Sequence, residues 1–460
     1  VLRGRMHRQR REPATERARP FGRPDHAGIL QPFHHREDLR LPRCRERRCR
    51  SVERRPDAVR PGRRDDLGRN PAVTEIVVAD YDEGRAAFVA GQVGNGKARP
   101  QFIDAGDSDM VAKAGEGCKL VVNAVIPEFN KGIMRACLKC GAAYQDMAQG
   151  QTRTQTIDEA YLDQMTLAPE FEKQGQLALL STGMDPGVTN TFAANGYEDL
   201  DKCFEIRIKD YALFDSPVPL QVWSQETYYI DCAQPPLVYE DGEFKRVEIF
   251  GRREQYPFPE PFGLGTVIAH DHEEVTTLPR TLPKALGEKG LRYVDFKMGG
   301  DEAGLDADHA LVASGMTSKY PVKLKDGSEI RPIDVFVATL EPNPPADELA
   351  RLALAGEITD FGVVTVDCIG EKNGKPATIG YYIYPPDIKW VNGQIPGATC
   401  VSYGTSTPAS IYAEFIVEGR ITQKGMICPE ELTRDVRDAF IAEMGVRNMP
   451  VFRKDVAAAN

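Results

Sequence analysis

Between residues 76 and 183, short apolar runs alternate with stretches that have the spacing and end signals of helices. The runs are rich in Val, Leu and Ile, which is typical of strands buried on both faces of a parallel sheet. The expected elements are strand 76–80, helix 82–92, strand 101–105, helix 108–117, strand 119–127, helix 128–141, strand 142–148, helical residues 156–175 and strand 176–183. This order predicts an α/β fold with a Rossmann-like, doubly wound parallel sheet.

The strand at residues 76–80 corresponds to the second strand of a dinucleotide-binding domain rather than to the first. It ends in Asp80, and a carboxylate at this place commonly binds the adenosine ribose. In that motif a G-x-G-x-x-G loop lies about 20 residues earlier. Here the region reads "RSVERRPDAVRPGRRDDLG", with neither the glycine motif nor an apolar strand before it. We therefore expect the sheet to lack its first strand and to have an open slot beside residues 75–80.

Residues 1–70 differ in composition from the rest of the chain. They contain 21 Arg, no Lys and 10 acidic residues, whereas residues 71–460 contain 37 basic and 58 acidic residues. Transit peptides are rich in Ser and poor in acids, so the single Ser argues against that interpretation. Arg without Lys is typical of a GC-rich coding strand translated out of frame; a natural disordered tail and a basic arm are the alternatives. We expect no regular structure in this leader and assign it no catalytic residue.

The pattern changes from about residue 189. The stretch "CFEIRIKDY" alternates apolar with charged residues, which is typical of a half-exposed strand. Three later segments place Asp-Gly or Asn-Gly between two strand-like runs, and this is a strong hairpin signal. They are "PPLVYEDGEFKRVEIF", "YPVKLKDGSEIRPI" and "VVTVDCIGEKNGKPATIGYYIYP". We therefore expect a Rossmann domain at 71–188, an inserted α+β antiparallel-sheet domain for substrate binding and dimerisation at 189–397, and a C-terminal segment at 398–460.

The loops after the carboxyl ends of parallel strands form the ligand crevice of such a fold. The candidate cofactor contacts at these ends are Asp80, Asp104, Asn123, Pro127 and Asp146. Asp80 predicts NAD as the cofactor, with NADP as the alternative, because a 2′-phosphate would bring like charges together. After the last strand, Asp185 precedes Pro186 as an N-cap precedes a first-turn proline. We therefore expect a helix to begin there with free N–H groups in the crevice.

Several other kinds of function have little support in the sequence. No window approaches the roughly 18 consecutive apolar residues of a membrane span, so we expect a cytoplasmic protein without a membrane partner. The scattered Arg of the leader does not predict a nucleic-acid partner. His270 and His272 lack a convincing third zinc ligand, and we expect no metal. The expected partners are a small-molecule substrate and a second copy of the chain in a homodimer.

Five motifs in the right order resemble the saccharopine dehydrogenase family, including its carboxynorspermidine dehydrogenase branch. They are "VVNAVIPEFNKGIMRACLKCGAAYQDMA", "ALLSTGMDPGVTN", "HDHEEVTTLPR", "ASGMTS" and "SYGTSTPASIYAEFIVEGRITQKGMICPEEL". The resemblance runs from about residue 70 to the C-terminus. It implies a nucleotide-binding Rossmann domain, an inserted substrate domain and a C-terminal segment that returns to the first domain. It also implies NAD(P)-dependent interconversion of an imine and a secondary amine, in amino-acid or polyamine metabolism.

The resemblance also implies catalytic residues. His272 is the leading acid–base candidate, supported by Glu273 or Glu274, because His-Glu-Glu matches a motif of the polyamine branch; a structural strand histidine is the competing interpretation. Asp185 is the further catalytic candidate. Substrate carboxylates require polar partners, and the candidates for substrate binding are Arg252, Arg253, Arg280, Lys319 and Gln149.

The sequence departs from the family pattern at two places. The glycine loop is missing, and "DMAQG" has no Tyr where members often carry one just beyond Asp146. Two alternatives to the main interpretation therefore stay open. One is another imine-reducing or polyamine-forming member, and the other is a catalytically inactive binding or structural protein that has lost its cofactor loop.

Overall fold

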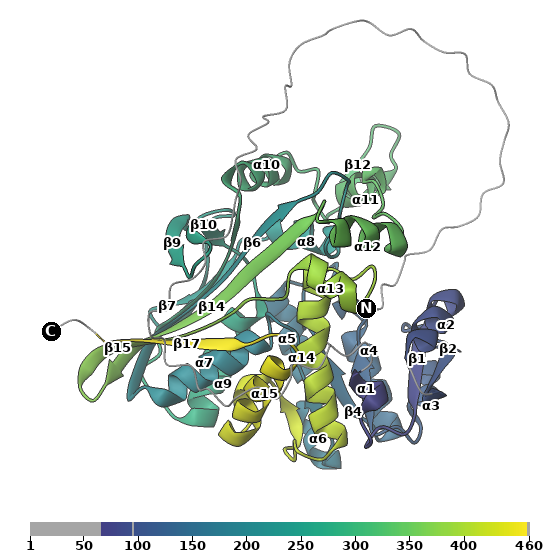
Figure 1. Ribbon diagram of the computed structural model, residues 1–460, viewed down its shortest axis with the longest axis horizontal. Coiled ribbons are helices and arrows are strands. Elements are labelled where there is room, and N and C mark those ends of the chain that lie inside the picture. The colour runs from purple at the N-terminus through teal and green to yellow at the C-terminus, as the bar shows by residue number, and fades with distance from the viewer. Residues whose placement is uncertain (1–65, 94–95, 458–460) are drawn as a thin grey trace, which may run out of the picture. The chain divides into compact units, whose positions relative to one another are not determined.

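The computed structural model describes residues 66–93 and 96–457, which fall within one compact unit (Figure 1). Most of the leader, residues 1–65, lies outside the described part of the chain. The prediction that the leader has no regular structure therefore falls on residues that the structure does not describe. Only its last residues are described, and Asp66–Arg69 form the short helix α1. None of residues 66–70 belongs to a strand.

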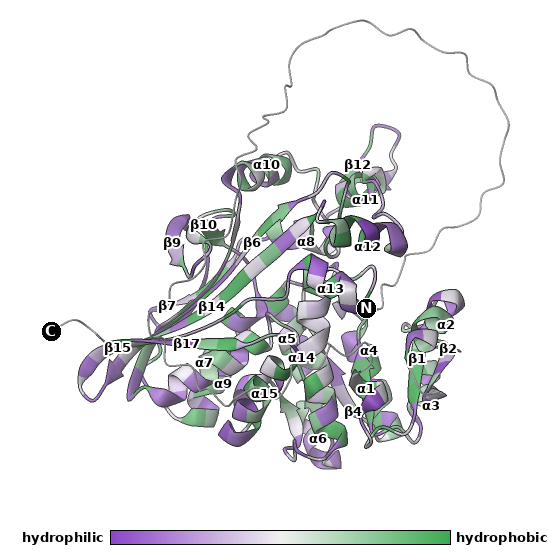
Figure 2. Cartoon of the chain, viewed as in Figure 1, coloured by the Kyte–Doolittle hydropathy of each residue, from purple (hydrophilic) through white to green (hydrophobic). Residues whose placement is uncertain are grey.

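Strands and helices alternate after α1 in the order that the sequence predicts. They are β1 (Ile76–Asp80), α2 (Glu83–Gln92), β2 (Ala98–Phe102), α3 (Ser108–Gly115), β3 (Leu120–Asn123), the 3-10 helix η2 (Pro127–Phe129), α4 (Asn130–Cys140), β4 (Ala143–Asp146), α5 (Ile157–Met165), α6 (Ala168–Gln174) and β5 (Leu177–Leu179). Hydrophobic residues make up most of β1, as Figure 2 shows. β2 begins before the predicted strand 101–105, and Pro100 is tolerated in it because β2 is an edge strand.

The parallel sheet of this half is divided into two parts. β1 pairs with β2, whereas β3, β4 and β5 form a separate sheet with β16 (Gly425–Ile427) at its far edge. Within the described residues, no strand pairs with the second edge of β1 or with the free edge of β3. In a doubly wound sheet the first strand occupies this place, between the second and the fourth. Among the described residues, no strand therefore fills the place where the sequence predicts an open slot.

The second half of the chain forms a nine-stranded sheet. Its strands are β6 (Lys202–Asp215), β7 (Leu237–Glu240), β8 (Glu243–Arg246), β9 (Glu254–Phe258), β10 (Gly263–Ala269), β11 (Tyr293–Gly300), β14 (Thr359–Lys372), β15 (Lys375–Ile383) and β17 (Val451–Ala457). Its pairs are antiparallel except for β6 with β11, so the sheet is mixed rather than wholly antiparallel. The three predicted hairpins are present, one of them as the small separate sheet of β12 (Val322–Lys323) and β13 (Glu329–Ile330).

Together with Val391 of α13 (Ile388–Gln394), four longer helices share the main hydrophobic core with the large sheet. They are α7 (Val188–Asp199), α9 (Glu273–Leu286), α14 (Cys400–Val417) and α15 (Arg434–Val446). Phe192, Ile208, Phe296, Val366 and Tyr412 lie in this core, each at most 2% exposed. The remaining helices of this half are α8 (Gln225–Cys232), α10 (Glu302–Ala313), α11 (Pro332–Thr339), α12 (Ala346–Ala355), α13 (Ile388–Gln394) and the 3-10 helix η3 (Pro429–Glu431). The core thus fixes α7 and α9 against β6 and β11.

Two features of the larger region differ from simple expectation. The alternation in β6 predicts exposed charges, but this is wrong for Lys209, whose side chain is 1% exposed. Its ammonium group instead lies 4.7 Å from the ring centroid of Tyr256 and 3.7 Å from the carboxylate of Glu254.

After residue 397 the chain first adds β16 to the sheet of β5, but its last strand, β17, pairs with β15 of the large sheet. None of the described helices is long and apolar enough to cross a membrane.

Candidate active site

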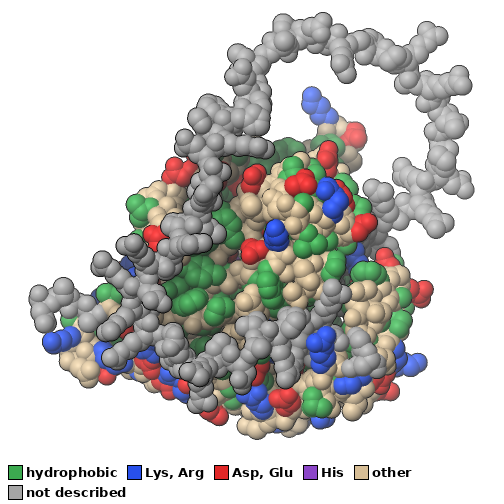
Figure 3. Space-filling view, viewed as in Figure 1, with side chains coloured by type: hydrophobic (Ala, Val, Ile, Leu, Met, Phe, Trp, Pro, Cys, Tyr) green, Lys and Arg blue, Asp and Glu red, His purple; other side chains and the backbone are tan. Residues whose placement is uncertain are grey.

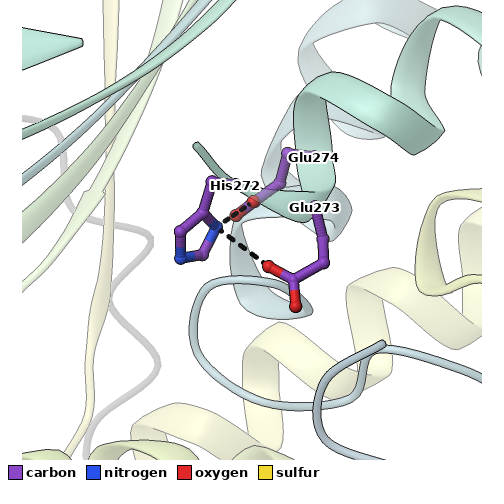
Figure 4. Close-up of side chains that lie close together, drawn as sticks. All are labelled: His272, Glu273 and Glu274. Atoms are coloured by element: carbon purple, nitrogen blue, oxygen red, sulfur yellow. Dashed lines mark hydrogen bonds and ion pairs between the residues drawn. The ribbon is translucent and has the colours of Figure 1, made fainter. Parts of the chain in front are cut away.

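His272 lies where strand β10 ends and helix α9 begins. It occupies the N-cap position of α9, and Glu273 and Glu274 are the first two residues of the helix. Negative charge is favoured there by the helix dipole. Glu273 is 4% exposed and Glu274 is fully buried, while the side chain of His272 is 17% exposed. Three adjacent residues therefore place an imidazole and two carboxylates at one buried helix end (Figure 4).

A chain of contacts fixes the orientation of His272. Its Nδ1 lies 2.5 Å from Oε2 of Glu274, and Oε1 of Glu274 accepts a hydrogen bond from the hydroxyl of Thr189 at 2.6 Å. The imidazole also stacks on Phe296, with 3.9 Å between ring centroids and 9° between planes. In Figure 4 the second ring nitrogen points away from both glutamates. Nε2 of His272 is therefore the atom that this arrangement presents to a ligand.

Three further carboxyl groups lie near His272 and come from other elements. Asp185 follows β5, Asp210 is on β6 and Asp231 is in the last turn of α8. Burial, and next the charge of Asp210, raise the pKa of Asp185 well above its usual value. Burial raises the pKa of Asp210 to about 6 and that of Asp231 to about 8, although Gln151 donates a hydrogen bond to Asp231. With a pKa of about 8, Asp231 holds a proton at pH 7 that a cationic ligand would displace.

The two histidines of this segment carry different charges. Burial opposes a charge on His272, but the carboxylates of Glu274, Glu273 and Asp185 outweigh it and raise its pKa well above the usual value. Burial and the neighbouring His272 lower the pKa of His270 to about 3. His272 is therefore the cation of the cluster, and His270 is neutral.

The loop after β4 lies against this cluster. The N–H of Gly150 donates to Oε1 of Glu273 at 2.8 Å. Gly150 has a positive φ of 46°, and a Cβ there would lie 2.4 Å from Cγ of Pro127, so only glycine fits. Gln149 is buried, its amide donates to Sγ of Cys428 at 3.5 Å, and its Oε1 has no partner among the described residues. The predicted residues Pro127 and Gln149 are thus brought close to Glu273.

Asp185 does not cap a helix, and that prediction is wrong. Helix α7 begins at Val188, and its N-cap is Gly187 with a φ of 135°. The N–H of Gly187 donates to Oδ1 of Asn190 at 2.8 Å, and a Cβ on Gly187 would lie 2.2 Å from the carbonyl oxygen of Gly183. Because Gly187 forms the turn, the helix begins later than Pro186 predicts. The carboxyl group of Asp185 belongs to the acidic surroundings of His272 instead.

Two of the predicted substrate-binding cations are held by surface carboxylates. Arg252 pairs with Glu240 at 3.2 Å, and Arg253 pairs with Asp306 at 2.7 Å. Both arginine side chains are 42% exposed. The structure does not bring either of them to His272 through a contact, and both have the environment of ordinary surface ion pairs.

The other two predicted cations, Lys319 and Arg280, also have partners within the chain. Lys319 is 3% exposed and donates to Oε1 of Gln151 at 3.0 Å and to the carbonyl oxygens of residues 152 and 155 at 3.1 Å each. Since Gln151 also donates to Asp231, Lys319 holds the loop beside the acidic cluster. Arg280 lies with its guanidinium carbon 3.9 Å from the ring centroid of Phe244. All three donors of Lys319 are engaged, which leaves it little capacity to bind a substrate carboxylate.

Asp80 has the environment of a ribose contact. It is 8% exposed, and its Oδ1 accepts from the N–H of Asp82 at 2.9 Å. Its buried Oδ2 has no hydrogen-bond partner among the described residues. A buried oxygen of this kind requires a donor, which a ribose hydroxyl provides. The described chain therefore fits the adenosine end of NAD(P), but it contains no glycine loop for the pyrophosphate.

Three other predicted cofactor contacts use polar atoms within the protein. Asp104 accepts from the backbone N–H two residues later at 2.8 Å, and Asn123 donates to Oδ1 of Asn130 at 2.8 Å. Asp146 is 1% exposed and accepts from the N–H of Ser181 at 2.6 Å, while burial raises its pKa to about 7. These contacts fix the loops at the strand ends.

Sequence reasoning missed Asp210, Asp231 and Thr189. A signal for Asp210 exists, because "CFEIRIKDY" places it in phase with Ile206 and Ile208, as a carboxylate on an otherwise apolar face. Asp231 and Thr189 have no such signal, since their distance from His272 depends on how α8 and α7 pack.

The geometry of the cluster also bears on metal binding. His272, Glu273 and Glu274 offer one ligand atom each within 4.8 Å of one another. However, Nδ1 of His272 already lies at hydrogen-bond distance from Glu274, and the second ring nitrogen points elsewhere. A charge-assisted hydrogen bond from a protonated imidazole to Glu274 accounts for the position of Nδ1 without a metal ion.

Comparison with known proteins gives two matches to family models and several curated relatives. Residues 64–179 match the saccharopine dehydrogenase NADP binding domain, and residues 183–449 match the saccharopine dehydrogenase C-terminal domain. The chain is 27% identical over 321 residues to carboxynorspermidine synthase of Vibrio alginolyticus, covering 69% of this chain and 73% of that protein. It is 26% identical over 384 residues to carboxyaminopropylagmatine dehydrogenase of a Synechocystis species, covering 82% and 90%.

Solved structures show the same fold. Apo saccharopine dehydrogenase (L-Glu forming) of Saccharomyces cerevisiae has a TM-score of 0.61 at 14% identity, covering 86% of this chain and 98% of that one. Homospermidine synthase of Legionella pneumophila, solved in complex with NAD, has a TM-score of 0.58 at 13% identity, covering 82% and 85%. With family models matched over both halves of the described chain, the protein belongs to the saccharopine dehydrogenase family, whose members are NAD(P)-dependent oxidoreductases.

Proposed function

We propose that the protein interconverts an imine and a secondary amine with NAD(P)H, and that its amine substrate is a polyamine. The observation that carries this proposal is the charged His272, held at 2.5 Å from Glu274 among several buried carboxyl groups. Two curated relatives support the substrate class, because their names describe carboxylated polyamines.

The geometry of His272 suits it to act as an acid. An amine and an aldehyde first combine to a carbinolamine, which loses water to become an iminium ion. The departing hydroxyl needs a proton, and Nε2 of His272 can donate it while Glu274 stabilises the imidazole in place. Buried carboxylates such as Asp210 and Glu273 then stabilise the iminium cation. NAD(P)H, when bound, supplies the hydride that reduces this cation to the secondary amine.

The charge of the site favours an amine over a dicarboxylic amino acid. Asp185, Asp210 and Asp231 lie near His272, whereas Arg252 and Arg253 form surface ion pairs. Moving a substrate carboxylate into this group of acids would be unfavourable, but each ammonium group of a polyamine gains a partner. This argues for polyamine rather than lysine metabolism.

Calorimetric titration of the full chain with spermidine tests the substrate class without any cofactor. We expect spermidine to bind and glutamate not to bind, and Asp231→Asn to weaken spermidine binding about tenfold through loss of one ion pair. Asp241→Asn, at an exposed hairpin turn, is the matched control. Affinity should rise with pH through about 8, where Asp231 becomes charged while the two primary ammonium groups of spermidine stay protonated. Glutamate binding more tightly than spermidine would contradict the proposal.

We also propose a cytoplasmic homodimer. Figure 3 shows hydrophobic side chains gathered in a hollow over β14 of the large sheet. On the neighbouring strands, Phe452 is 39% exposed and stacks on Tyr382 at 5.1 Å between ring centroids. An exposed aromatic cluster of this kind supports association. Light scattering should show that the wild-type chain is a dimer and that Phe452→Asp weakens this dimer. Phe88→Asp, on α2, is the control and should not weaken it. A monomeric wild-type chain would contradict the proposal.

The competing proposal is an inactive binding protein. It is favoured by the missing pyrophosphate loop, and it predicts no change in nicotinamide fluorescence with NADH or NADPH even when a glycine loop is supplied.

A further inference from the structure

Lys319 joins two segments that lie far apart in the sequence. It follows α10 and is 3% exposed. Its ammonium group donates to Oε1 of Gln151 at 3.0 Å and to the carbonyl oxygens of Thr152 and Gln155 at 3.1 Å each. These acceptors all lie in the loop between β4 and α5. One buried cation therefore holds this loop to the larger half of the chain.

The contact with Lys319 determines which way the amide of Gln151 faces. An ammonium group only donates hydrogen bonds, so it requires the amide oxygen. The amide nitrogen of Gln151 then faces Asp231 and donates to its Oδ1. With the amide reversed, N–H groups would face the ammonium group and an oxygen would face the carboxylate. Lys319 therefore acts on Asp231 through Gln151.

The same contact gives the two carboxyl oxygens of Asp231 different roles. Because Oδ1 accepts from Gln151, a proton on this acid must lie on Oδ2. Burial raises the pKa of Asp231 to about 8, and the hydrogen bond from Gln151 opposes this rise. Asp231 is partly exposed, and its Oδ2 has no hydrogen-bond partner among the described residues. It is therefore the oxygen that is available to a ligand.

The ionisable groups around Asp231 come from several segments. They are Cys232 on its own helix, Asp271, His272 and Glu273 at the start of α9, and Lys319. Asp271 is already paired with Arg246 at 2.7 Å. Glu273 accepts from the N–H of Gly150, which belongs to the loop that Lys319 holds. This loop therefore positions two acids beside His272.

We propose that Lys319 is a positioning residue for the amine substrate. Through Gln151 it holds Oδ1 of Asp231 as an acceptor and leaves Oδ2 to accept from an ammonium group of a polyamine. Lys319 is itself a cation whose donors are all engaged within the protein, so it does not bind the substrate. The substrate part of the inference rests on the proposed function, whereas the arrangement of Lys319, Gln151 and Asp231 does not.

Titration of Asp231 in the full chain without any ligand tests this arrangement. Aspartate is isotopically labelled at its side-chain carboxyl and followed by NMR, and the signal of Asp231 is the one that Asp231→Asn lacks. Gln151→Met removes the donor to Oδ1, and Lys319→Met frees the amide of Gln151 to turn and accept a proton from Asp231. Both changes favour the neutral acid, so the midpoint should move about one pH unit higher. Lys323→Met, at an exposed position of β12, is the matched control and should not move it.

Calorimetric titration with spermidine tests the consequence for binding. At pH 8 Asp231 is about half charged, and a shift of about one pH unit leaves about one tenth of it charged. Gln151→Met and Lys319→Met should therefore each bind spermidine about fivefold more weakly at this pH. In an Asp231→Asn background the same changes should have no further effect, because they act through Asp231.

An unchanged titration of Asp231 in either variant would overturn the inference. Gln151→Met keeps Lys319 and its carbonyl acceptors, so it gives this answer even where the loss of Lys319 unfolds the loop. An equal loss of spermidine affinity with and without Asp231 would also overturn the inference. A shifted titration in a chain that does not bind spermidine would support the arrangement of Asp231 and contradict the proposed function.

Discussion

At the scale of single residues, the orientation of His272 explains how one imidazole can act among so many acids. Nδ1 is held by Glu274, Glu274 is held by Thr189, and the ring rests on Phe296. The His-Glu-Glu sequence was sufficient to predict that this segment matters. It could not show which glutamate orients the ring, because that depends on a contact with α7.

The first prediction concerns Glu274→Gln. This change removes a carboxylate that raises the pKa of His272, so the pKa should fall toward the usual value of about 6.5. His272 must be protonated to act as an acid, so the alkaline limb of the pH–rate profile should move to lower pH. At pH 8 the rate should fall about 10- to 100-fold. Glu243→Gln, at an exposed position of β8, should not shift the pH–rate profile. An unshifted profile in Glu274→Gln would contradict the role of Glu274.

The second prediction concerns cofactor choice. The buried Oδ2 of Asp80 can accept from a ribose hydroxyl but would repel a 2′-phosphate, so we expect NADH to be preferred over NADPH. Asp80→Ser removes the negative charge. The ratio of kcat/KM with NADH to kcat/KM with NADPH should therefore fall by about tenfold in this variant. Steady-state kinetics with both cofactors measures it. A wild-type chain that uses NADPH better than NADH would refute the assignment.

At the scale of elements, Glu430 links three segments through a buried carboxyl group. It lies in η3, where its Oε1 accepts from Thr281 of α9 at 2.8 Å and its Oε2 from Asn190 of α7 at 3.0 Å. Burial, and next Glu431, raise its pKa to about 7. The folded state therefore keeps this proton in a pH range where the unfolded chain releases it.

The third prediction follows from this linkage. Because the folded pKa of Glu430 is raised, its contribution to stability is fully present below about pH 4.5 and is lost as pH rises to about 7. Glu430→Gln mimics the protonated acid at every pH. Over this pH window the free energy of unfolding of the variant should therefore fall by about 3 kcal/mol less than that of the wild type. Urea unfolding at several pH values measures this. The prediction fails if the free energy of unfolding of Glu430→Gln depends on pH in the same way as that of the wild type. It also fails if Glu329→Gln, at an exposed position of β13, changes this pH dependence as Glu430→Gln does.

Sequence periodicity predicted most elements because burial on both faces leaves a continuous apolar run in a strand such as β5. Periodicity failed where the bounds of a strand or the burial of a side chain depend on contacts with residues distant in sequence. β2 begins at Ala98 because its register follows β1, and Lys209 is buried because Tyr256 and Glu254 replace water around its ammonium group. Neither partner is adjacent to these residues in sequence, so local patterns could not show them.

At the scale of the whole molecule, the sequence predicted the α/β architecture. Among the described residues the parallel sheet is divided between β1 and β3, where the sequence predicted an open slot. The acidic surroundings of His272 could not be predicted in the same way. Asp185, Asp210 and Asp231 come from three separate segments, and only the packing of the large sheet against α7, α8 and α9 brings them together.

The central claim, reduction of an imine to a polyamine-derived secondary amine, is tested most directly by following the hydride. The chain is mixed with a diamine, an aldehyde and NADH deuterated at the transferable position of the nicotinamide ring. Mass spectrometry of the product should show a secondary amine with one deuterium on the carbon beside the new C–N bond, and His272→Asn should form it about 100-fold more slowly. A secondary amine without deuterium, or no secondary amine in the presence of bound NADH, would contradict the account.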